Sequence, residues 1–142
     1  FKQILAAEGW DCFRTPLIWH KPNGSRTPWV DSGPQRKYEI ILYARKGGKL
    51  VTRIYPDVIT AVADENLGHH AQKPVALYVD LLRRSVGPGD RVLDPFSGSG
   101  PIIPAAQALQ VRATALEIDA AAYAIGVERL KKLKEQPELE GL

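Results

Sequence analysis

The stretch that decides the fold is Arg91–Gly100, RVLDPFSGSG. Its apolar pair Val92-Leu93 prefers extended backbone, which predicts a buried parallel strand. Asp94 ends the apolar run, and Gly98-Ser99-Gly100 then allow a tight turn and the close approach of a ligand. A helix is expected to begin near Pro101, since proline is tolerated in a first helical turn. A strand, a glycine turn and a helix N-terminus together predict a site for an anionic group of a small cofactor.

Helices and strands are expected to alternate around this stretch. Hydrophobic periodicity predicts helices over Pro74–Val86, Ile102–Leu109 and Tyr123–Leu133, and a second strand over Ala113–Ile118. This order predicts a right-handed, parallel α/β unit. Asp80 and Arg84 are spaced to pair at i, i+4 on the first helix. The predicted core faces are Val75, Tyr78, Leu81, Leu82 and Ser85 on the first helix, and Tyr123, Val127 and Leu130 on the last.

The part of the chain before residue 70 has weaker patterns. Turn residues and short apolar runs divide it into brief segments. The expected segments are a helix over Phe1–Gly9, strands over Cys12–Trp19 and Tyr38–Ala44, a loop over His20–Gly33, a hairpin partner over Leu50–Tyr55 and irregular backbone over Asp57–His70.

Length and composition describe one ordinary globular domain. The chain has 142 residues, of which 44% are hydrophobic and 25% charged. No stretch is long and apolar enough for a membrane span, and no signal-peptide pattern opens the chain. The single Cys12 excludes an internal disulfide and suits a reducing compartment. The chain begins at Phe1 and contains no methionine, so we expect it to be a piece of a longer protein.

The net charge of +3 is unevenly distributed. Cys12–Arg53 holds nine Lys or Arg against Asp31 and Glu39, together with Trp19, Trp29, Tyr38 and Tyr43. Basic residues interleaved with aromatics are typical of a nucleic-acid surface. A solvated basic face over core aromatics explains the same pattern equally well.

Glu117 ends the predicted second strand. An acidic residue about 20 residues after a glycine turn is placed to accept hydrogen bonds from ribose hydroxyls. The dinucleotide fingerprint would require a further glycine where Ile103 stands, which disfavours a nicotinamide or flavin dinucleotide. A ribose-bearing cofactor without a pyrophosphate is the better fit.

The chain resembles the DNA amino-methyltransferases. The motifs that carry this resemblance are DPFSGSG, HHAQKPVALYVDLLRRSVGPGDRVL before it and ALEIDAAAYAIGVERL after it, with looser matches at LIWHKPN and YEIILYARKGG. These enzymes transfer a methyl group from S-adenosylmethionine to the exocyclic amine of adenine or cytosine, often in restriction–modification. The order of motifs is similar to the permuted subgroup, in which the catalytic half precedes the cofactor half.

The resemblance implies an α/β fold, namely a Rossmann-like methyltransferase sheet with flanking helices that is incomplete at its N-terminus. Residues 1–142 would form one domain fragment, with the substrate side in 1–69 and the cofactor half in 70–135. It also implies that the protein is located in the cytoplasm of a bacterial or phage-infected cell. By position, the residues implied to bind S-adenosylmethionine are Asp94, Phe96, Ser97, Gly98, Ser99, Gly100, Glu117, Gln72, Lys73 and Pro74.

Two departures from the family pattern affect this assignment. Pro101-Ile102 stand where small hydroxyl residues are usual, and Pro104 removes an early helical hydrogen bond. The family's catalytic motif is Asp, Asn or Ser followed by two prolines and an aromatic, and the sequence contains no Pro-Pro pair. We therefore predict no catalytic residue in this chain and expect that motif on a segment upstream of Phe1.

The expected partners are DNA, that upstream catalytic segment and no membrane. Apolar surface exposed by such a half would also favour a homodimer. The adjacent His69-His70 and the distant Cys12 lack metal-ligand spacing, so no metal site is predicted. Two alternatives stay open, a non-catalytic remnant that keeps the fold, and a methyltransferase for RNA or a small molecule. The expected DNA contacts are Lys21, Asn23, Arg26, Arg36 and Lys37.

Overall fold

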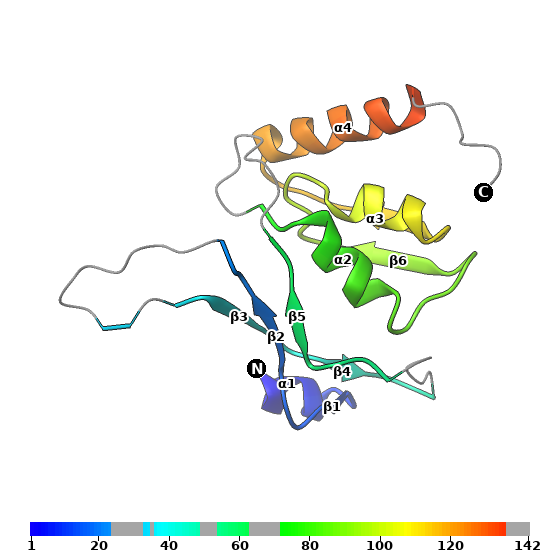
Figure 1. Ribbon diagram of the computed structural model, residues 1–142. Helices are drawn as coiled ribbons and strands as arrows, with labels where there is room; N and C mark the ends of the chain where they lie inside the picture. The colour runs from blue at the N-terminus through cyan, green and yellow to red at the C-terminus, as the bar shows by residue number, and fades with distance from the viewer. Residues whose placement is uncertain (24–32, 35, 49–53, 63–71, 136–142) are drawn as a thin grey trace. The chain divides into compact units, whose positions relative to one another are not determined.

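The computed structural model describes residues 1–23, 33, 34, 36–48, 54–62 and 72–135 (Figure 1). The chain divides into two compact units, Phe1–Ala63 and Asp64–Leu142. The elements are α1 Lys2–Ala7, β1 Asp11–Cys12, β2 Leu17–His20, β3 Tyr38–Ile41, β4 Ala44–Arg45, β5 Val58–Thr60, α2 Val75–Leu82, β6 Arg91–Asp94, α3 Ile102–Ala108, β7 Arg112–Ala115 and α4 Ala120–Glu135. Among the described residues, every helix is too short or too polar to span a bilayer.

The second unit contains the predicted α/β alternation. Strands β6 and β7 pair in parallel, with Arg91 opposite Arg112 and Asp94 opposite Ala115. Helix α3 connects them and packs against α2, α4 and β7, and Figure 1 shows α2 and α3 next to each other. The prediction of a parallel strand–helix–strand unit around RVLDPFSGSG is therefore confirmed. Buried apolar side chains of this unit are Leu77, Ile102, Ala105, Ala106, Val111 and Ala122.

The predicted core faces of the helices are wrong in part. The most buried side chain of α2 is Leu77, which the predicted face omitted. On α4 the buried residues are Ala122 and Gly126, whereas Tyr123 is 55% exposed. At Gly126 the helix lies against the backbone of the glycine turn, with Gly100 N and Ser99 C 3.7 Å from the position of a Cβ.

Leu93 departs from the expectation of a buried strand. Its side chain is 63% exposed, while its neighbour Val92 is half-buried. Successive side chains of a strand point to opposite faces, so the face of β6 that carries Leu93 is largely open to solvent.

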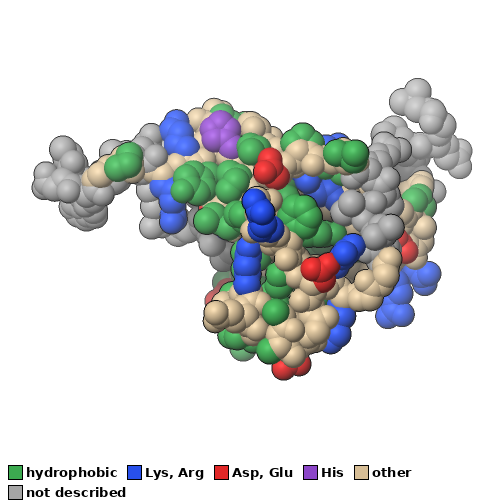
Figure 2. All heavy atoms as spheres, turned by 90° about the horizontal axis from the view of Figure 1, so that it is seen from below, with side chains coloured by type: hydrophobic (Ala, Val, Ile, Leu, Met, Phe, Trp, Pro, Cys, Tyr) green, Lys and Arg blue, Asp and Glu red, His purple; other side chains and the backbone are tan. Residues whose placement is uncertain are grey.

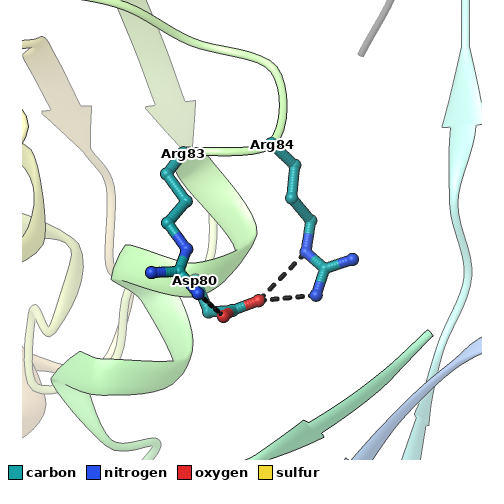
Figure 3. A network of polar contacts seen from close by, with 3 residues as sticks. All are labelled: Asp80, Arg83 and Arg84. Carbon is teal, nitrogen blue, oxygen red and sulfur yellow. Dashed lines mark hydrogen bonds and ion pairs between the residues drawn. The ribbon is translucent and has the colours of Figure 1, made fainter. Parts of the chain in front are cut away.

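Helix α2 ends in a polar cluster around Asp80 (Figure 3). Arg84 is 7% exposed, and its Nε and Nη2 donate to Asp80 Oδ1 at 3.0 and 2.6 Å. Arg83 bonds the other carboxylate oxygen. The predicted i, i+4 pair of Asp80 and Arg84 is confirmed.

Three strand predictions in the first unit need correction. Cys12–Trp19 contains two short strands, β1 and β2, rather than one, with Pro16 between them. Tyr38–Ala44 likewise splits, because β3 pairs with β2 whereas β4 pairs with β1. Residues 58–60, expected to be irregular, form β5 through parallel pairing with β2, a distant contact that local patterns do not encode. Most of the predicted hairpin partner Leu50–Tyr55 lies outside the described residues.

The sheet of the first unit has strand order β3-β2-β5 and two unlike faces. On one face Leu17, Trp19 and Ile59 are buried, and Trp19 Nε1 donates to the Ala61 carbonyl at 2.9 Å. On the other face Ile40 and Val58 are 59% and 50% exposed. Figure 2 shows many apolar side chains at the molecular surface with Lys and Arg side chains among them.

Candidate cofactor site at the glycine turn

The turn after β6 is fastened to the end of β7 by hydrogen bonds. Ser97 donates to the Leu116 carbonyl twice, from its backbone nitrogen at 2.9 Å and from its hydroxyl at 3.1 Å. The Phe96 amide donates to Asp94 Oδ1 at 3.2 Å, and the Gly100 amide donates to the Ser97 carbonyl at 2.9 Å. The carboxyl ends of both parallel strands therefore meet at one place, which is where open α/β sheets bind ligands.

Glu117 connects the glycine turn after β6 to the backbone that follows β7. Its Oε2 accepts a hydrogen bond from the Gly98 amide at 2.6 Å, and its Oε1 accepts one from the Asp119 amide at 2.8 Å. The hydrogen bonds from Asp119 and then from Gly98 lower the pKa of Glu117, so the carboxylate is ionised at neutral pH. Each carboxylate oxygen can accept a further hydrogen bond, so a ribose hydroxyl can bind without displacing either amide.

Gly100 and Gly126 allow α4 to approach the turn closely. A Cβ on Gly100 would lie 2.9 Å from Ile103 Cδ1 and 3.1 Å from Gly126 Cα, and its φ of +72° is a left-handed conformation. Gly126 is a glycine in the interior of α4, and the sequence predictions assign it no role. An isolated glycine inside a helical pattern often marks such close packing.

Ser99 fits a ligand that supplies a hydrogen-bonding group. It is 1% exposed, and among the described residues its hydroxyl has no hydrogen-bond partner. A buried polar group without a partner is costly, so a polar ligand atom at this turn would satisfy it. The donors and acceptors of Ser99 and Glu117 suit the hydroxyl and amino groups of a nucleoside-type cofactor.

Tyr78 is a neighbour of Asp94 that the sequence analysis placed only in the core of α2. Burial raises the pKa of the Tyr78 hydroxyl above its usual range, and the negative charge of Asp94 and a hydrogen bond to it raise that pKa further. The phenol therefore stays protonated beside the carboxylate. Among the described residues, the buried Asp94 Oδ2 has no hydrogen-bond partner.

The first turn of α3 is a poor anion site. Pro101 and Pro104 have no N–H, and the Ile103 amide donates to the Gly100 carbonyl at 3.1 Å. Helix α3 also has seven residues and no side-chain cap. Few backbone N–H groups are therefore available at this N-terminus for the predicted binding of an anionic group.

A cavity of about 640 Å³ lies beside the turn. It shares Ser97, Gly98 and Gly100 with the predicted site, but its lining includes neither Asp94 nor Glu117. The rest of its wall is Ile103, Ala106, Gln107, Val111, Ala113, Ala115, Tyr123, Gly126, Val127, Leu130, Leu133 and Lys134. The cavity is thus a space among α3, β7 and α4 rather than the predicted cofactor pocket.

The remaining predicted cofactor residues are placed as follows. Phe96 is 85% exposed at the turn. Pro74 is fully buried and is the N-cap of α2, and Gln72-Lys73 precede it as half-buried residues. The part that Gln72-Lys73 and Pro74 play in a cofactor site stays a prediction.

The predicted DNA contacts lie in the first unit. Lys21 pairs with Glu39 and lies over the Trp19 ring, with its Nζ 4.6 Å from the ring centroid. Lys37 Nζ donates to the Pro22 carbonyl at 3.3 Å. These two cations stabilise the β2–β3 hairpin. Asn23 and Arg36 are exposed, and Arg26 lies outside the described residues.

The described residues contain no group of three His, Cys, Asp or Glu placed to hold a metal ion. What they contain is a parallel strand–helix–strand unit with a glycine turn after the first strand and an acid after the second. These features define the class of α/β domains that bind nucleotide-like cofactors.

The family follows from comparison with known sequences. The DNA methylase family N6_N4_Mtase matches residues 51–136, more than half of the chain, and the chain belongs to this family. It is similar to the type II methyltransferase M.Cfr9I of Citrobacter freundii, with 27% identity over 89% of this chain and 47% of the relative. The chain thus spans about half the length of that relative.

Solved structures share the fold. The M1.HpyAVI–SAM complex has a TM-score of 0.78 and 25% identity, and the match covers 90% of this chain and 66% of that one. The cytosine-N4-specific PvuII DNA methyltransferase has a TM-score of 0.70 and 18% identity, over 93% of this chain and 59% of that one. The predicted Rossmann-like methyltransferase fold is confirmed by these similarities.

Proposed function

We propose that this chain is the S-adenosylmethionine-binding part of a DNA methyltransferase that methylates the exocyclic amine of adenine or cytosine. The observation that carries the proposal is Glu117, an ionised carboxylate fastened to the Gly98 amide across the glycine turn. Family membership and the similarity to a methyltransferase solved with S-adenosylmethionine support it.

Different residues of the chain would bind different groups of the cofactor. Glu117 would accept hydrogen bonds from the ribose hydroxyls, and the buried Ser99 hydroxyl would bond a polar atom near the turn. Asp94, whose buried Oδ2 has no hydrogen-bond partner among the described residues, would face the methionine ammonium. Bound there, the cofactor supplies a methyl group on a sulfonium, and the chain's role is to bind and orient it.

A ribose-deletion cycle tests the role of Glu117. Calorimetry would compare adenosine with 2′,3′-dideoxyadenosine, and then S-adenosylmethionine itself, on the wild-type chain and on Glu117→Ala. We expect removal of the hydroxyls to weaken binding to the wild type about tenfold but to leave binding to the variant unchanged, because the partner carboxylate is gone. Equal losses in both proteins would reject the ribose contact, and no binding of S-adenosylmethionine to the folded wild type would reject the cofactor site.

We further propose that methyl transfer needs a catalytic segment outside this chain. The sequence contains no Pro-Pro pair of the kind that the resembling family uses at its target amine. Incubation of the chain alone with DNA and tritiated S-adenosylmethionine should give no labelled DNA. The longer protein with an intact motif should give N6-methyladenine or N4-methylcytosine, which nucleoside analysis distinguishes. Labelling by the isolated chain would refute this division, and an inactive longer protein would favour the alternative of a remnant that keeps only the fold.

A further inference from the structure

We propose that Tyr38, which lies at one end of the β3-β2-β5 sheet and within the basic stretch Cys12–Arg53, contacts DNA by stacking on an exposed base. The inference rests on the proposed function, because it names a residue that would hold the nucleic-acid substrate.

The register of the sheet places Tyr38 in a row with two other polar side chains. His20 of β2 is opposite Tyr38 of β3 and opposite Thr60 of β5. Side chains of directly paired residues share one face of a sheet, and His20 Nδ1 lies 3.4 Å from Thr60 Oγ1. The three side chains therefore form a phenol–imidazole–hydroxyl row across one end of the sheet.

The exposure of Tyr38 separates it from the aromatic core. Tyr38 is 47% exposed, whereas Trp19 on the opposite face is 2% exposed and fills the core. The neighbouring row on the same face is aliphatic, with Ile40, Ile18 and Val58 in register. Of the two rows on this face that the structure describes, the end row is the one that offers an exposed ring with hydrogen-bonding groups beside it.

The position of this row favours nucleic acid over protein as its ligand. Arg36 is exposed and lies two positions before Tyr38, so it places a cation near the row at the end where the chain leaves the sheet. Lys21 follows His20 in the chain, but its Nζ lies over the Trp19 ring of the opposite face. Lys21 and Lys37 donate hydrogen bonds to Glu39 and to the Pro22 carbonyl, respectively, while Arg36 is exposed. Exposed aromatic rings beside cations are the usual means of binding unstacked bases along a phosphate backbone.

Fluorescence anisotropy with two labelled single-stranded oligonucleotides of equal length, one of mixed sequence and one fully abasic, tests the inference. Tyr38→Ala should weaken binding of the base-bearing strand about tenfold, within the range for one aromatic–base stack. It should leave binding of the abasic strand unchanged. Arg36→Gln should weaken binding of both strands and lower the salt slope by about 0.7, the loss of one phosphate contact on a single strand.

Two further variants complete the test. Tyr38→Phe should retain binding, because stacking needs the ring and not the hydroxyl. Ile40→Ala, on the same face of the same strand, should retain it as well. Equal losses for Tyr38→Ala on both strands would overturn the inference. An equal loss for Ile40→Ala would overturn it as well, because the effect would then come from this face of the sheet in general and not from the ring of Tyr38.

The cofactor titrations separate this inference from the function on which it rests. Binding of S-adenosylmethionine without any binding of oligonucleotide would overturn the role of Tyr38 and leave the cofactor site intact. Oligonucleotide binding that Tyr38→Ala does not change would overturn it as well.

Discussion

Replacing Gly100 with alanine should destabilise the second unit by about 3 kcal/mol. A positive φ, +72° at Gly100, costs an L-residue about 1–2 kcal/mol. The new Cβ would also lie 2.9 Å from Ile103 Cδ1 and 3.1 Å from Gly126 Cα. The isoleucine methyl can rotate away, but the Cα of Gly126 is backbone of α4, and overpacking of this kind costs about 1–3 kcal/mol.

Two matched variants separate these contributions. Gly89 has a φ of +84° and open space around its Cβ position, so Gly89→Ala should cost only the backbone strain of about 1–2 kcal/mol. The Cβ of Gly126→Ala would meet nothing closer than 3.7 Å, and alanine favours a helix over glycine by about 1 kcal/mol. Gly126→Ala should therefore be neutral or slightly stabilising.

Urea denaturation followed by circular dichroism at 222 nm measures all three variants. Helices α2, α3 and α4 belong to the second unit, so the helical signal reports mainly on that unit. A cost for Gly100→Ala no greater than that for Gly89→Ala would refute the close approach of α4 to the turn. If Gly126→Ala is as harmful as Gly100→Ala, the Cβ position of Gly126 is more crowded than its 3.7 Å contacts indicate, and the prediction of a neutral substitution there is wrong.

Three further predictions concern ionic groups. Asp80→Ala removes the carboxylate that pairs with the buried Arg84 guanidinium and should lower the free energy of unfolding by about 3 kcal/mol in the same denaturation assay. Arg83→Ala breaks a more exposed ion pair and should lower it by less than about 1 kcal/mol. Folding lowers the pKa of Glu117, so the ionised carboxylate stabilises the folded chain fully at pH values above the ordinary glutamate pKa. This stabilisation is lost as the pH falls through the lowered pKa of the folded chain. Glu117→Gln should therefore flatten the acid side of a stability–pH profile, and an unchanged profile would contradict this prediction. Lys21→Gln should lower the stability of the first unit by about 1 kcal/mol in a tryptophan-fluorescence melt, while Arg36→Gln leaves it unchanged; equal effects would show that the Lys21 contacts with Glu39 and Trp19 contribute nothing.

The parallel unit of the fold was predictable because its signals are local. RVLDPFSGSG combines an apolar run, an acid and a glycine turn within ten positions, and ALEID repeats the strand-and-acid pattern. The strands of the first unit were less predictable, because β5 exists only through pairing with β2, some 40 positions earlier in the chain. Its three residues, Val58, Ile59 and Thr60, are β-branched and favour extended backbone, but so short a run does not show with which strand it pairs.

The candidate site was predictable as a set of residues but not as a set of contacts. Glu117 follows the turn at a suitable spacing, which predicts a ligand for ribose, yet the structure shows that the same carboxylate also holds the Gly98 amide. Tyr78 was assigned to the helix core because its spacing fits one, and only three-dimensional structure brings its hydroxyl to Asp94. Periodicity identifies buried faces, whereas the position of a hydroxyl beside a distant carboxylate has no sequence period.

The contacts of Glu117 have a consequence for how the site works. Because one carboxylate both fixes the Gly98 amide and is placed for the ribose, the turn is already formed before a cofactor binds. A preformed turn lowers the conformational entropy that binding must overcome. A variant that loses the carboxylate therefore loses order as well as a ligand contact, and only the comparison of ribose with dideoxyribose separates the two effects.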